Sequence, residues 1–431
     1  MERRHTKILM VAEKFPPHAT SGTARSFYFA RHLGEFGYQP VVLAAPVLGG
    51  NPSDAELLQR LPPEVEVWRP SPAMIVAGSA ARSAWATVRP NRQRPDAAAP
   101  RASSLRKTMT WFLYWHLDWL PPAFVRGLQV ARRRDVQLVW VTAPHAKNLP
   151  LGYALSRALH RPLVVDLRDP WTYGSLWRPT SPLAERIELA WAGKILAAAA
   201  LVVFTSPLTQ REMEARFACL RGKCMTITNG FSDEEQSIAP RRGGLDGKCL
   251  LRHCGVLNDR RRPDPLLRGL ELAVEQRPAL RSSIHLEFVG DMGGNDSTLC
   301  RSGVADCVSA LGRVSRSSSL ALMRGADVNV LLQTITSGVD VIGGKTFDYL
   351  AARRPILAVV DPTGGDAWLL GQSTGNVVVP WNSEQDIAHA IVGLHEQWRA
   401  GTLAATSPDL AAYEQRRLTE RLAGAFDRVL H

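Results

Sequence analysis

The feature that most constrains the fold is a repeated alternation between short apolar segments and amphipathic helical segments. In the first half, the apolar segments are predicted strands at residues 7–12, 40–45, 136–142, 161–167, 200–206 and 224–228. In the second half, they lie at 248–255, 284–290, 307–311, 327–332, 355–360 and 376–380. Near-continuous apolar strands are buried on both faces, and strands that alternate with helices form parallel sheets. The sequence therefore predicts an α/β chain with two doubly wound, Rossmann-like sheets.

The length of 431 residues exceeds what one compact core supports, and it fits two domains. We expect an N-terminal Rossmann-like domain at residues 1–232, a polar, glycine-rich linker at 233–247, and a C-terminal Rossmann-like domain at 248–405. An insertion rich in Ala, Arg, Pro and Ser interrupts the first domain at about residues 70–110. Residues 406–431 are expected to form a helix that packs back on the N-terminal domain. Ligands of such sheets bind at the carboxyl ends of the strands, which predicts a site in an interdomain cleft.

Composition narrows the class of protein. The content of 45% hydrophobic and 21% charged residues is that of a globular protein, and the longest apolar run, residues 195–204, is too short to span a bilayer. No signal peptide is evident, so we expect a cytoplasmic protein. The six cysteines show no metal-ligand spacing with histidine, so we expect buried, reduced thiols and no metal site.

Positive charge is concentrated in the first half, where residues 1–240 hold 30 Lys and Arg against 19 Asp and Glu. Residues 82–134 alone carry eleven basic and two acidic side chains. An anionic acceptor or a peripheral membrane contact would explain this charge, and a solvated basic loop is the alternative. Trp111, Trp115 and Trp119 form a stripe in the same segment. The stripe is interpreted as core packing, a ligand pocket or an interfacial helix.

The stretch SGVDVIGGKTFDYLAARRPILAVV, residues 337–360, places two glycines and Lys345 before a predicted helix at 346–354. The free N–H groups and positive dipole of a helix N-terminus attract phosphate, and glycines let a ligand approach closely. Asp348 lies one turn further, where it could accept hydrogen bonds from ligand hydroxyls or pair with Lys345. An ordinary capped helix is the alternative.

Taken in order, this stretch and the motifs KFPPHATSGTARSFYFARHL, DLRDPW, NGF and GRVSRSSSLALMRGADVNVLL resemble the retaining glycosyltransferases of the GT-B fold, family 4. The resemblance covers nearly the whole chain except about residues 70–110. It implies two Rossmann-like domains that face each other across a cleft. Members of that family carry a Glu-x7-Glu pair, whose positions correspond here to Asp340 and Asp348.

The resemblance assigns donor-binding roles in the C-terminal domain. Asp340 would contact hydroxyls of the donor sugar and Asp348 those of the ribose, with Gly343, Gly344 and Lys345 near the diphosphate. The sequence GVLNDRRRPDPLL places Gly255 and three arginines at a second phosphate-binding turn. Of these arginines we favour Arg262, then Arg260, and expect Arg261 to be solvated. Gly312, Arg313 and Val314 correspond to the loop that binds the base.

In the N-terminal domain, Gly22 would present backbone N–H groups to the phosphates or the acceptor, and an ordinary loop-to-helix turn is the alternative. The predicted catalytic residues are Arg262 and Lys345, which hold the leaving diphosphate, together with His145 and Asp169. An internal ion pair between Asp166 and Arg168 is an alternative to an active-site role for that segment. The predicted acceptor-binding residues at the ends of two strands are Thr142, Lys147, Arg168 and Trp171.

The function implied is a metal-independent, retaining glycosyltransferase without a resident cofactor, which uses a nucleotide-diphosphate sugar, with a UDP- or GDP-sugar expected. Its setting would be envelope polysaccharide or glycolipid assembly, with a lipid-linked or anionic acceptor and no nucleic acid partner. One alternative is a glycosyltransferase that acts on a soluble natural-product intermediate. The other alternative is a nucleotide-sugar-binding protein without catalytic activity.

Overall fold

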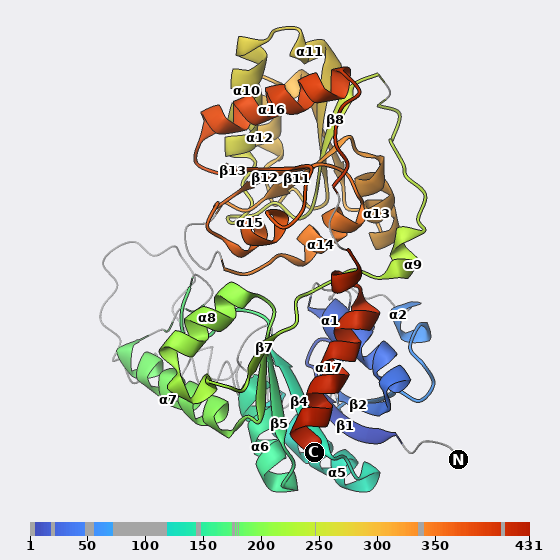
Figure 1. The fold of residues 1–431 in the computed structure, drawn as a ribbon, viewed down its shortest axis with the longest axis vertical. Coiled ribbons are helices and arrows are strands. Elements are labelled where there is room, and N and C mark those ends of the chain that lie inside the picture. The colour runs from blue at the N-terminus through green and yellow to red at the C-terminus, as the bar shows by residue number, and fades with distance from the viewer. Residues whose placement is uncertain are drawn as a thin grey trace. The chain divides into compact units, whose positions relative to one another are not determined.

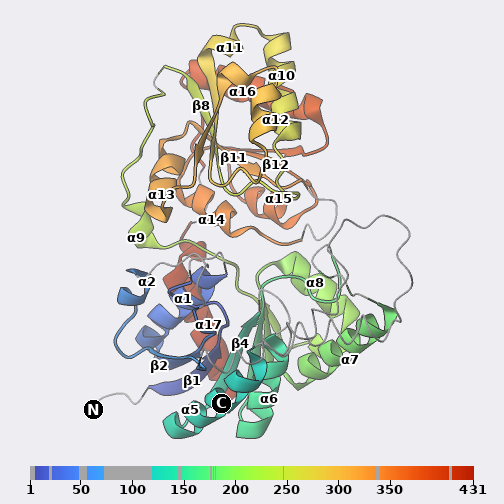
Figure 2. The same cartoon turned by 180° about the vertical axis from the view of Figure 1, so that it is seen from behind.

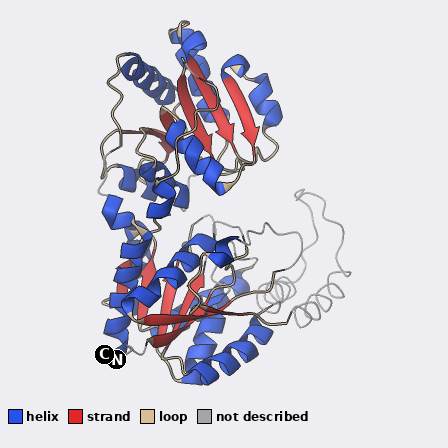
Figure 3. Ribbon diagram, turned by 90° about the vertical axis from the view of Figure 1, so that its right-hand side faces the viewer, coloured by secondary structure: helices blue, strands red, loops and turns tan. Residues whose placement is uncertain are grey.

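The computed structural model describes residues 5–18, 22–47, 56–71, 119–143, 148–174, 177, 179, 181–245, 247–334, 340–406 and 410–431. The chain divides into two compact units, Met1–Ile227 together with Thr419–His431, and Thr228–Leu418. Each unit contains one sheet with helices against it (Figure 3). Within these described ranges, no helix is both long enough and apolar enough to cross a membrane.

The first unit is built on a seven-stranded parallel sheet with the order β3-β2-β1-β4-β5-β6-β7. The strand order reverses between β1 and β4, which is the topological switch point of a doubly wound sheet. The strands are β1 (Thr6–Val11), β2 (Tyr38–Leu43), β3 (Glu66–Trp68), β4 (Leu138–Ala143), β5 (Leu163–Leu167), β6 (Leu201–Phe204) and β7 (Cys224–Thr226).

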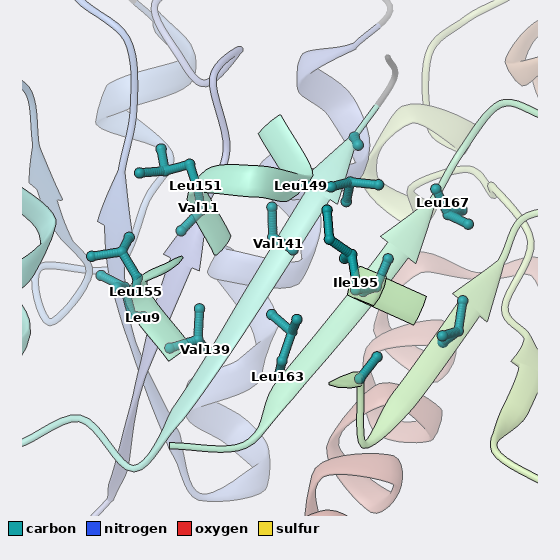
Figure 4. Packing of buried hydrophobic residues seen from close by; sticks show 14 of the residues in the cluster. Leu9, Val11, Val139, Val141, Leu149, Leu151, Leu155, Leu163, Leu167 and Ile195 are labelled. Atoms are coloured by element: carbon teal, nitrogen blue, oxygen red, sulfur yellow. The ribbon is translucent and has the colours of Figure 1, made fainter. Parts of the chain in front are cut away.

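The helices of the first unit are α1 (Thr23–His32), α2 (Glu56–Gln59), α5 (Leu120–Arg134), α6 (Leu149–Leu159), α7 (Pro182–Ala198), α8 (Pro207–Arg216) and α17 (Gln415–Leu430), with short 3-10 turns at Leu33–Phe36 and Ala218–Leu220. Helices α5, α6 and α7 contribute to one hydrophobic core with β1, β4 and β5. Figure 4 shows this core, in which Leu9, Val139 and Val141 of the strands meet Leu151 and Leu155 of α6. Alternate strand residues face the opposite side of the sheet, so both faces are buried.

The opposite face of the first sheet receives α1 and the C-terminal helix α17. Phe29 of α1 makes an edge contact with Trp140 of β4, with ring centroids 5.9 Å apart. Tyr38 of β2 donates its hydroxyl to Asp427 Oδ1 at 2.6 Å and packs on Phe426. The end of the chain is therefore part of the first unit.

The second unit is built on a six-stranded parallel sheet with the order β10-β9-β8-β11-β12-β13. Its strands are β8 (Cys249–Cys254), β9 (Ile284–Val289), β10 (Val308–Gly312), β11 (Val328–Leu332), β12 (Ile356–Val360) and β13 (Asn376–Pro380). The order reverses between β8 and β11, so the carboxyl ends of these two strands mark the switch point of this sheet.

The helices of the second unit separate onto the two faces of its sheet (Figures 1 and 2). One core contains α10 (Asp264–Gln276), α12 (Asp296–Arg301) and α16 (Glu384–Arg399), and the other contains α13 (Arg316–Gly325), α14 (Gly344–Ala351) and α15 (Gly365–Leu370). The remaining short elements are α9 (Asp233–Gln236), α11 (Leu280–Ser283), and 3-10 turns at Ala305–Cys307 and Leu410–Tyr413.

The predicted fold class is confirmed, because both halves are doubly wound parallel sheets. The segment from residue 233 to 247, read as a linker, is held against the second unit. The guanidinium of Arg252 donates to the carbonyls of Arg241 and Arg242, and Arg242 pairs with Asp327 at 2.8 Å. Of the tryptophan stripe, Trp119 is in the first core, 2% exposed, and Trp111 and Trp115 lie outside the described residues.

Candidate functional site

The glycine-rich turn before α14 forms the centre of the site in the second unit. The helix begins at Gly344, two residues earlier than predicted, with Gly343 as its N-cap. The buried carboxylate of Asp366 accepts hydrogen bonds from the Gly343 N–H at 2.9 Å and from the Thr346 hydroxyl. The first N–H groups of a helix have no partner inside it, so those of Gly344 and Lys345 face out of the N-terminus. An anion at this point would meet N–H donors and the positive end of the helix dipole.

Helix α14 is fixed to the end of strand β8. The buried Tyr349 hydroxyl accepts a hydrogen bond from the Cys254 N–H at 2.8 Å and donates to the Cys254 carbonyl at 3.2 Å. Burial raises the pKa of Tyr349 well above its ordinary value, so the phenol keeps its proton. The turn before α14 and the carboxyl end of β8 are therefore parts of one rigid site.

Two cationic side chains lie beside this turn. Burial lowers the pKa of His253 to about 4, with smaller contributions from the charges of Arg261 and Lys345. Lys345 is half-buried, and it makes no hydrogen bond or ion pair with any described residue. Together with the N–H groups of α14, Arg261 and Lys345 give this place a concentrated positive potential.

The arginine loop after β8 differs from the prediction in the directions of its side chains. Arg261 is half-buried; burial lowers its pKa, and the charge of the buried Asp366 opposes that shift. Arg262 is 58% exposed and pairs loosely with Asp264 at 3.4 Å. The expectation that Arg261 is solvated is therefore wrong.

Arg262 lies on the other side of the second sheet from α14. It lines an open groove of about 590 Å³ formed by α10, α12 and the segment before α16, together with Arg268, Arg301 and Trp381. The loop that separates the two directions is anchored by Thr334, whose N–H donates to the Arg260 carbonyl at 2.8 Å and whose hydroxyl accepts from the Arg262 N–H at 3.1 Å. Arg260 is half-buried between these two anchors.

Gly255 ends β8 in a position that only glycine fits easily. A Cβ atom there would lie 2.9 Å from His253 Nε2. The Gly255 N–H donates to the Val289 carbonyl at 2.8 Å, which ties the turn to β9. A side chain at this position would clash with the imidazole of His253.

Asp348 is buried and already engaged by a cation. Its Oδ1 accepts from Arg316 Nη2 at 3.1 Å, and the same guanidinium makes two bonds to Glu235 of α9, at 2.7 and 2.8 Å. The pairing with Lys345 that the sequence suggested is not the one formed among the described residues. A small crevice between α9, α13 and α14 includes Asp348.

Asp340 is the first described residue after the segment 335–339, which lies outside the described residues. The backbone of Asp340 packs against Gly365, where a Cβ atom would lie 2.6 Å from the Asp340 carbonyl oxygen. The backbone of Asp340 is thus packed against the start of α15.

The predicted base-binding loop follows β10. Gly312 has a φ of 73°, a left-handed conformation that favours glycine, and its carbonyl accepts from the Gly290 N–H at 2.7 Å. Arg313 is exposed and pairs with Asp291, while Val314 packs against the core that contains α14. Ser315 caps α13 by accepting from the Ser318 N–H at 3.2 Å. The loop thus presents mainly backbone next to Arg316.

In the first unit, a buried charge network occupies the carboxyl ends of β4 and β5. Asp166 binds Arg25 of α1 with Oδ1 at 2.7 Å from Nη2 and at 3.1 Å from Nε, and it accepts from the Thr142 hydroxyl at 2.7 Å. All three side chains are at most 3% exposed. Asp166 is therefore in an internal ion pair, as one alternative had it, and its partner in this pair is Arg25.

Arg168 supports the start of α1. Its guanidinium donates to the Gly22 carbonyl, and the charges of Asp169 and Asp166 oppose the lowering of its pKa that burial causes. Gly22 is the N-cap of α1. Gly22, Thr142, Arg168 and Asp169 therefore lie at the carboxyl-end side of the first sheet.

Trp171 is 5% exposed and belongs to the core of the first unit. Its indole N–H donates to Glu188 at 3.2 Å, and Trp177 donates to the same carboxylate at 2.8 Å. Burial raises the pKa of Glu188. These contacts favour a structural role for Trp171. His145 and Lys147 lie outside the described residues.

Sequence reasoning missed four residues that the structure brings into these sites. Arg25 and Arg316 are the cations that neutralise Asp166 and Asp348. His253 and Asp366 are buried polar groups next to Arg261. Two sequence signals were available: the histidine inside the apolar strand CLLRHC and the aspartate directly after two glycines, Gly364 and Gly365. Polar residues at buried positions are uncommon, so both indicated a structural or functional role.

The fold, with two Rossmann-like units that each contain one doubly wound parallel sheet, is the GT-B fold. The chain is similar in structure to HepE from Anabaena, crystallised in complex with UDP and glucose, with 17% identity over 98% of this chain and 100% of that one and a TM-score of 0.63.

Two further solved structures resemble the chain at similar levels. Sucrose-phosphate synthase from Thermosynechococcus elongatus shares 15% identity over 99% of each chain, with a TM-score of 0.64. The UDP-forming α,α-trehalose-phosphate synthase from Burkholderia xenovorans, in complex with glucose-6-phosphate, shares 13% identity over 98% of this chain and 99% of that one, with a TM-score of 0.62. The sequence matches no protein-family model and no curated protein. Identities this low establish the fold alone.

Proposed function

We propose that this protein is a glycosyltransferase that moves a sugar from a nucleoside-diphosphate sugar to an acceptor hydroxyl. The observation that carries the proposal is the N-terminus of α14, which Tyr349 fixes to the carboxyl end of β8 and which has Lys345 in its first turn. The charges of Arg261 and Lys345 both act on His253 at that strand end. Two cations and a helix N-terminus provide a site for a dianionic diphosphate. This assignment replaces Arg262 with Arg261 as the arginine that holds the donor phosphates.

The groups one helical turn beyond the proposed phosphate site could bind the nucleoside of the donor. Asp348 and Arg316 offer a carboxylate and a guanidinium for ribose hydroxyls, and the backbone at Gly312 and Val314 lies beside Arg316 for the base. The solved structures of HepE with UDP and with UDP-glucose support a uridine donor. Asp340, Gly343 and Gly255 would surround the sugar and its linkage to the diphosphate.

The transfer proposed is retaining and independent of a metal. The acceptor oxygen forms a bond to the anomeric carbon as the bond from that carbon to the phosphate oxygen breaks, and the electron pair leaves with the diphosphate. The departing phosphate oxygen takes the acceptor proton on the same face. Arg261 and Lys345, with the N–H groups of α14, stabilise the charge that develops on the diphosphate. Fixed cations at that point would supply the charge that a metal ion supplies elsewhere.

The acceptor is assigned to the first unit, at the edge formed by Gly22, Thr142, Arg168 and Asp169, with His145 and Lys147 as further proposed contacts. Arg25 and Asp166 hold this edge in place. The excess of basic residues in the first half supports an anionic or lipid-linked acceptor, such as an envelope polysaccharide or glycolipid intermediate at a membrane surface.

The proposal is tested with a panel of UDP-, GDP- and dTDP-sugars. Binding is measured as a rise in melting temperature, and turnover is measured as release of the nucleoside diphosphate. We expect a UDP-sugar to bind and to be consumed, and we expect Lys345→Met to suppress both while Arg262→Met does not. A wild-type protein that neither binds nor consumes any member of the panel would contradict the proposal.

A further inference from the structure

Several buried polar atoms of the second unit lack a hydrogen-bond partner among the described residues, and two of them are acceptors close to the turn before α14. They are Nε2 of His253 and Oδ2 of Asp366, and each residue is 2% exposed. Buried polar atoms are nearly always paired, so a pair of unsatisfied atoms near one site needs an explanation. Both atoms lie next to the proposed diphosphate site, beside Gly255 and Gly343 respectively.

The protonation state of His253 makes its Nε2 an acceptor. Nδ1 lies 2.9 Å from the Val330 carbonyl oxygen, which can only accept, so Nδ1 carries the proton. Burial keeps the ring neutral near pH 7, because it lowers the pKa to about 4. Nε2 therefore presents a lone pair and requires a donor.

The two carboxylate oxygens of Asp366 differ in their hydrogen bonds. Oδ1 accepts from the Gly343 N–H and the Thr346 hydroxyl and so fixes the turn before α14. Oδ2 makes no hydrogen bond with any described residue. The same carboxylate could thus support the turn with one oxygen and hold a neighbouring donor with the other.

Arg261 is the cation whose charge acts on both residues. Its charge acts on the pKa of His253 and on that of Asp366, whereas the charge of Lys345 acts on His253 alone of the two. The guanidinium has five N–H donors and makes no side-chain hydrogen bond with a described residue. Nε2 and Oδ2 are closed to solvent, so a neighbouring side chain can reach them more readily than a ligand.

We propose that His253 and Asp366 are positioning residues for Arg261: when a diphosphate is bound, they accept N–H groups of the guanidinium and direct its remaining N–H groups at the phosphate oxygens. This inference rests on the proposed function, because it assumes that the diphosphate occupies the turn before α14. A guanidinium held on two sides loses less rotational freedom when it binds phosphate, which strengthens binding.

The test is a double-mutant cycle on diphosphate affinity in the full chain. Asp366→Asn keeps an amide oxygen for Gly343 and Thr346 and replaces the Oδ2 acceptor by a donor. Binding of UDP and of inorganic pyrophosphate is measured by calorimetry for wild type, Asp366→Asn, Arg261→Met and the double variant. We expect Asp366→Asn to weaken binding about 10-fold in wild type and less than twofold in Arg261→Met, because the effect acts through Arg261.

Two further variants separate positioning from folding. Asp361→Asn makes the same change in the loop before α15, where the carboxylate binds only Thr363 among the described residues, and it should leave affinity unchanged. His253→Gln keeps an acceptor near the place of Nε2 and should bind UDP within threefold of wild type, whereas His253→Met should bind about 10-fold more weakly. Melting temperatures of all variants report whether the fold is intact.

Equal losses for Asp366→Asn with and without Arg261 would overturn the inference, as would wild-type affinity in both Asp366→Asn and His253→Met. Wild-type protein that binds pyrophosphate with the expected coupling, but no nucleoside diphosphate, would overturn the proposed function and leave the inference standing. Binding of neither ligand would overturn both.

Discussion

Replacement of Arg261 and of its neighbour Arg262 by methionine tests the site with two identical changes one residue apart. The charge of Arg261 acts on the buried Asp366 and His253 near the turn before α14, whereas Arg262 is 58% exposed on the other side of the sheet. Methionine keeps most of the aliphatic volume and removes the charge. The two variants therefore differ chiefly in which charge is lost.

The expected effects differ by orders of magnitude. An arginine that stabilises the leaving diphosphate contributes about 2–4 kcal/mol in the transition state, so Arg261→Met should lower kcat/KM for the donor by roughly 30- to 1000-fold. The ion pair of Arg262 with Asp264 is exposed at both ends, and such pairs contribute about 0–1 kcal/mol to stability. Arg262→Met should change kcat/KM by less than about twofold.

The assay is release of UDP from the donor under single-substrate conditions, with circular dichroism and melting temperature as controls for folding. Comparable losses in the two variants would refute the side-chain directions described here. A large loss in Arg262→Met with normal activity in Arg261→Met would instead identify Arg262, the arginine favoured from the sequence, as the one that binds the donor phosphates.

Three other predictions concern neighbouring groups. Asp348→Asn should raise the KM for the donor about 10-fold and change kcat less than twofold, because its carboxylate holds Arg316 where the ribose is expected; steady-state kinetics would contradict this if only kcat fell. Asp166→Asn should lower the free energy of unfolding by about 3–5 kcal/mol in urea titrations, because it leaves the buried Arg25 without its charge partner, and a loss below 1 kcal/mol would count against the network. The pKa of His253 is about 4 in the folded protein and near 6.5 in the unfolded chain, so the unfolded chain binds more protons between these two pH values. The contribution of the neutral imidazole to the free energy of unfolding should therefore be complete above pH 6.5 and lost as the pH falls toward 4. In urea titrations at several pH values, His253→Gln should flatten this part of the stability profile.

The fold was largely predictable because apolar periodicity is a local signal. Predicted strands at 376–380 and 284–290 agree with Asn376–Pro380 and Ile284–Val289. The edge strand Glu66–Trp68 was missed, since three half-buried residues give no apolar run. The amphipathic segment at residues 23–37 is helical only as far as His32 and continues as a 3-10 turn, because Gly34 and Gly37 weaken the last turn.

The site was predictable only in part, because side-chain direction in a loop depends on distant contacts. Arg261 and Arg262 are equivalent in sequence, and Thr334, more than seventy residues later, fixes the backbone that separates their directions. The partner of Asp166 is likewise Arg25, a pairing across 141 positions that no local pattern encodes. The glycine-rich turn at Gly343 and Gly344 was found because helix N-termini have a recognisable local sequence.

The most direct test of the central claim is a crystal structure of the protein with UDP. The account predicts that the diphosphate lies at the N-terminus of α14, within hydrogen-bond distance of the Gly344 and Lys345 N–H groups and of the Arg261 guanidinium. It also predicts the ribose beside Asp348 and Arg316. A diphosphate bound instead in the groove of Arg262, between α10 and α12, would contradict the assignment of this site.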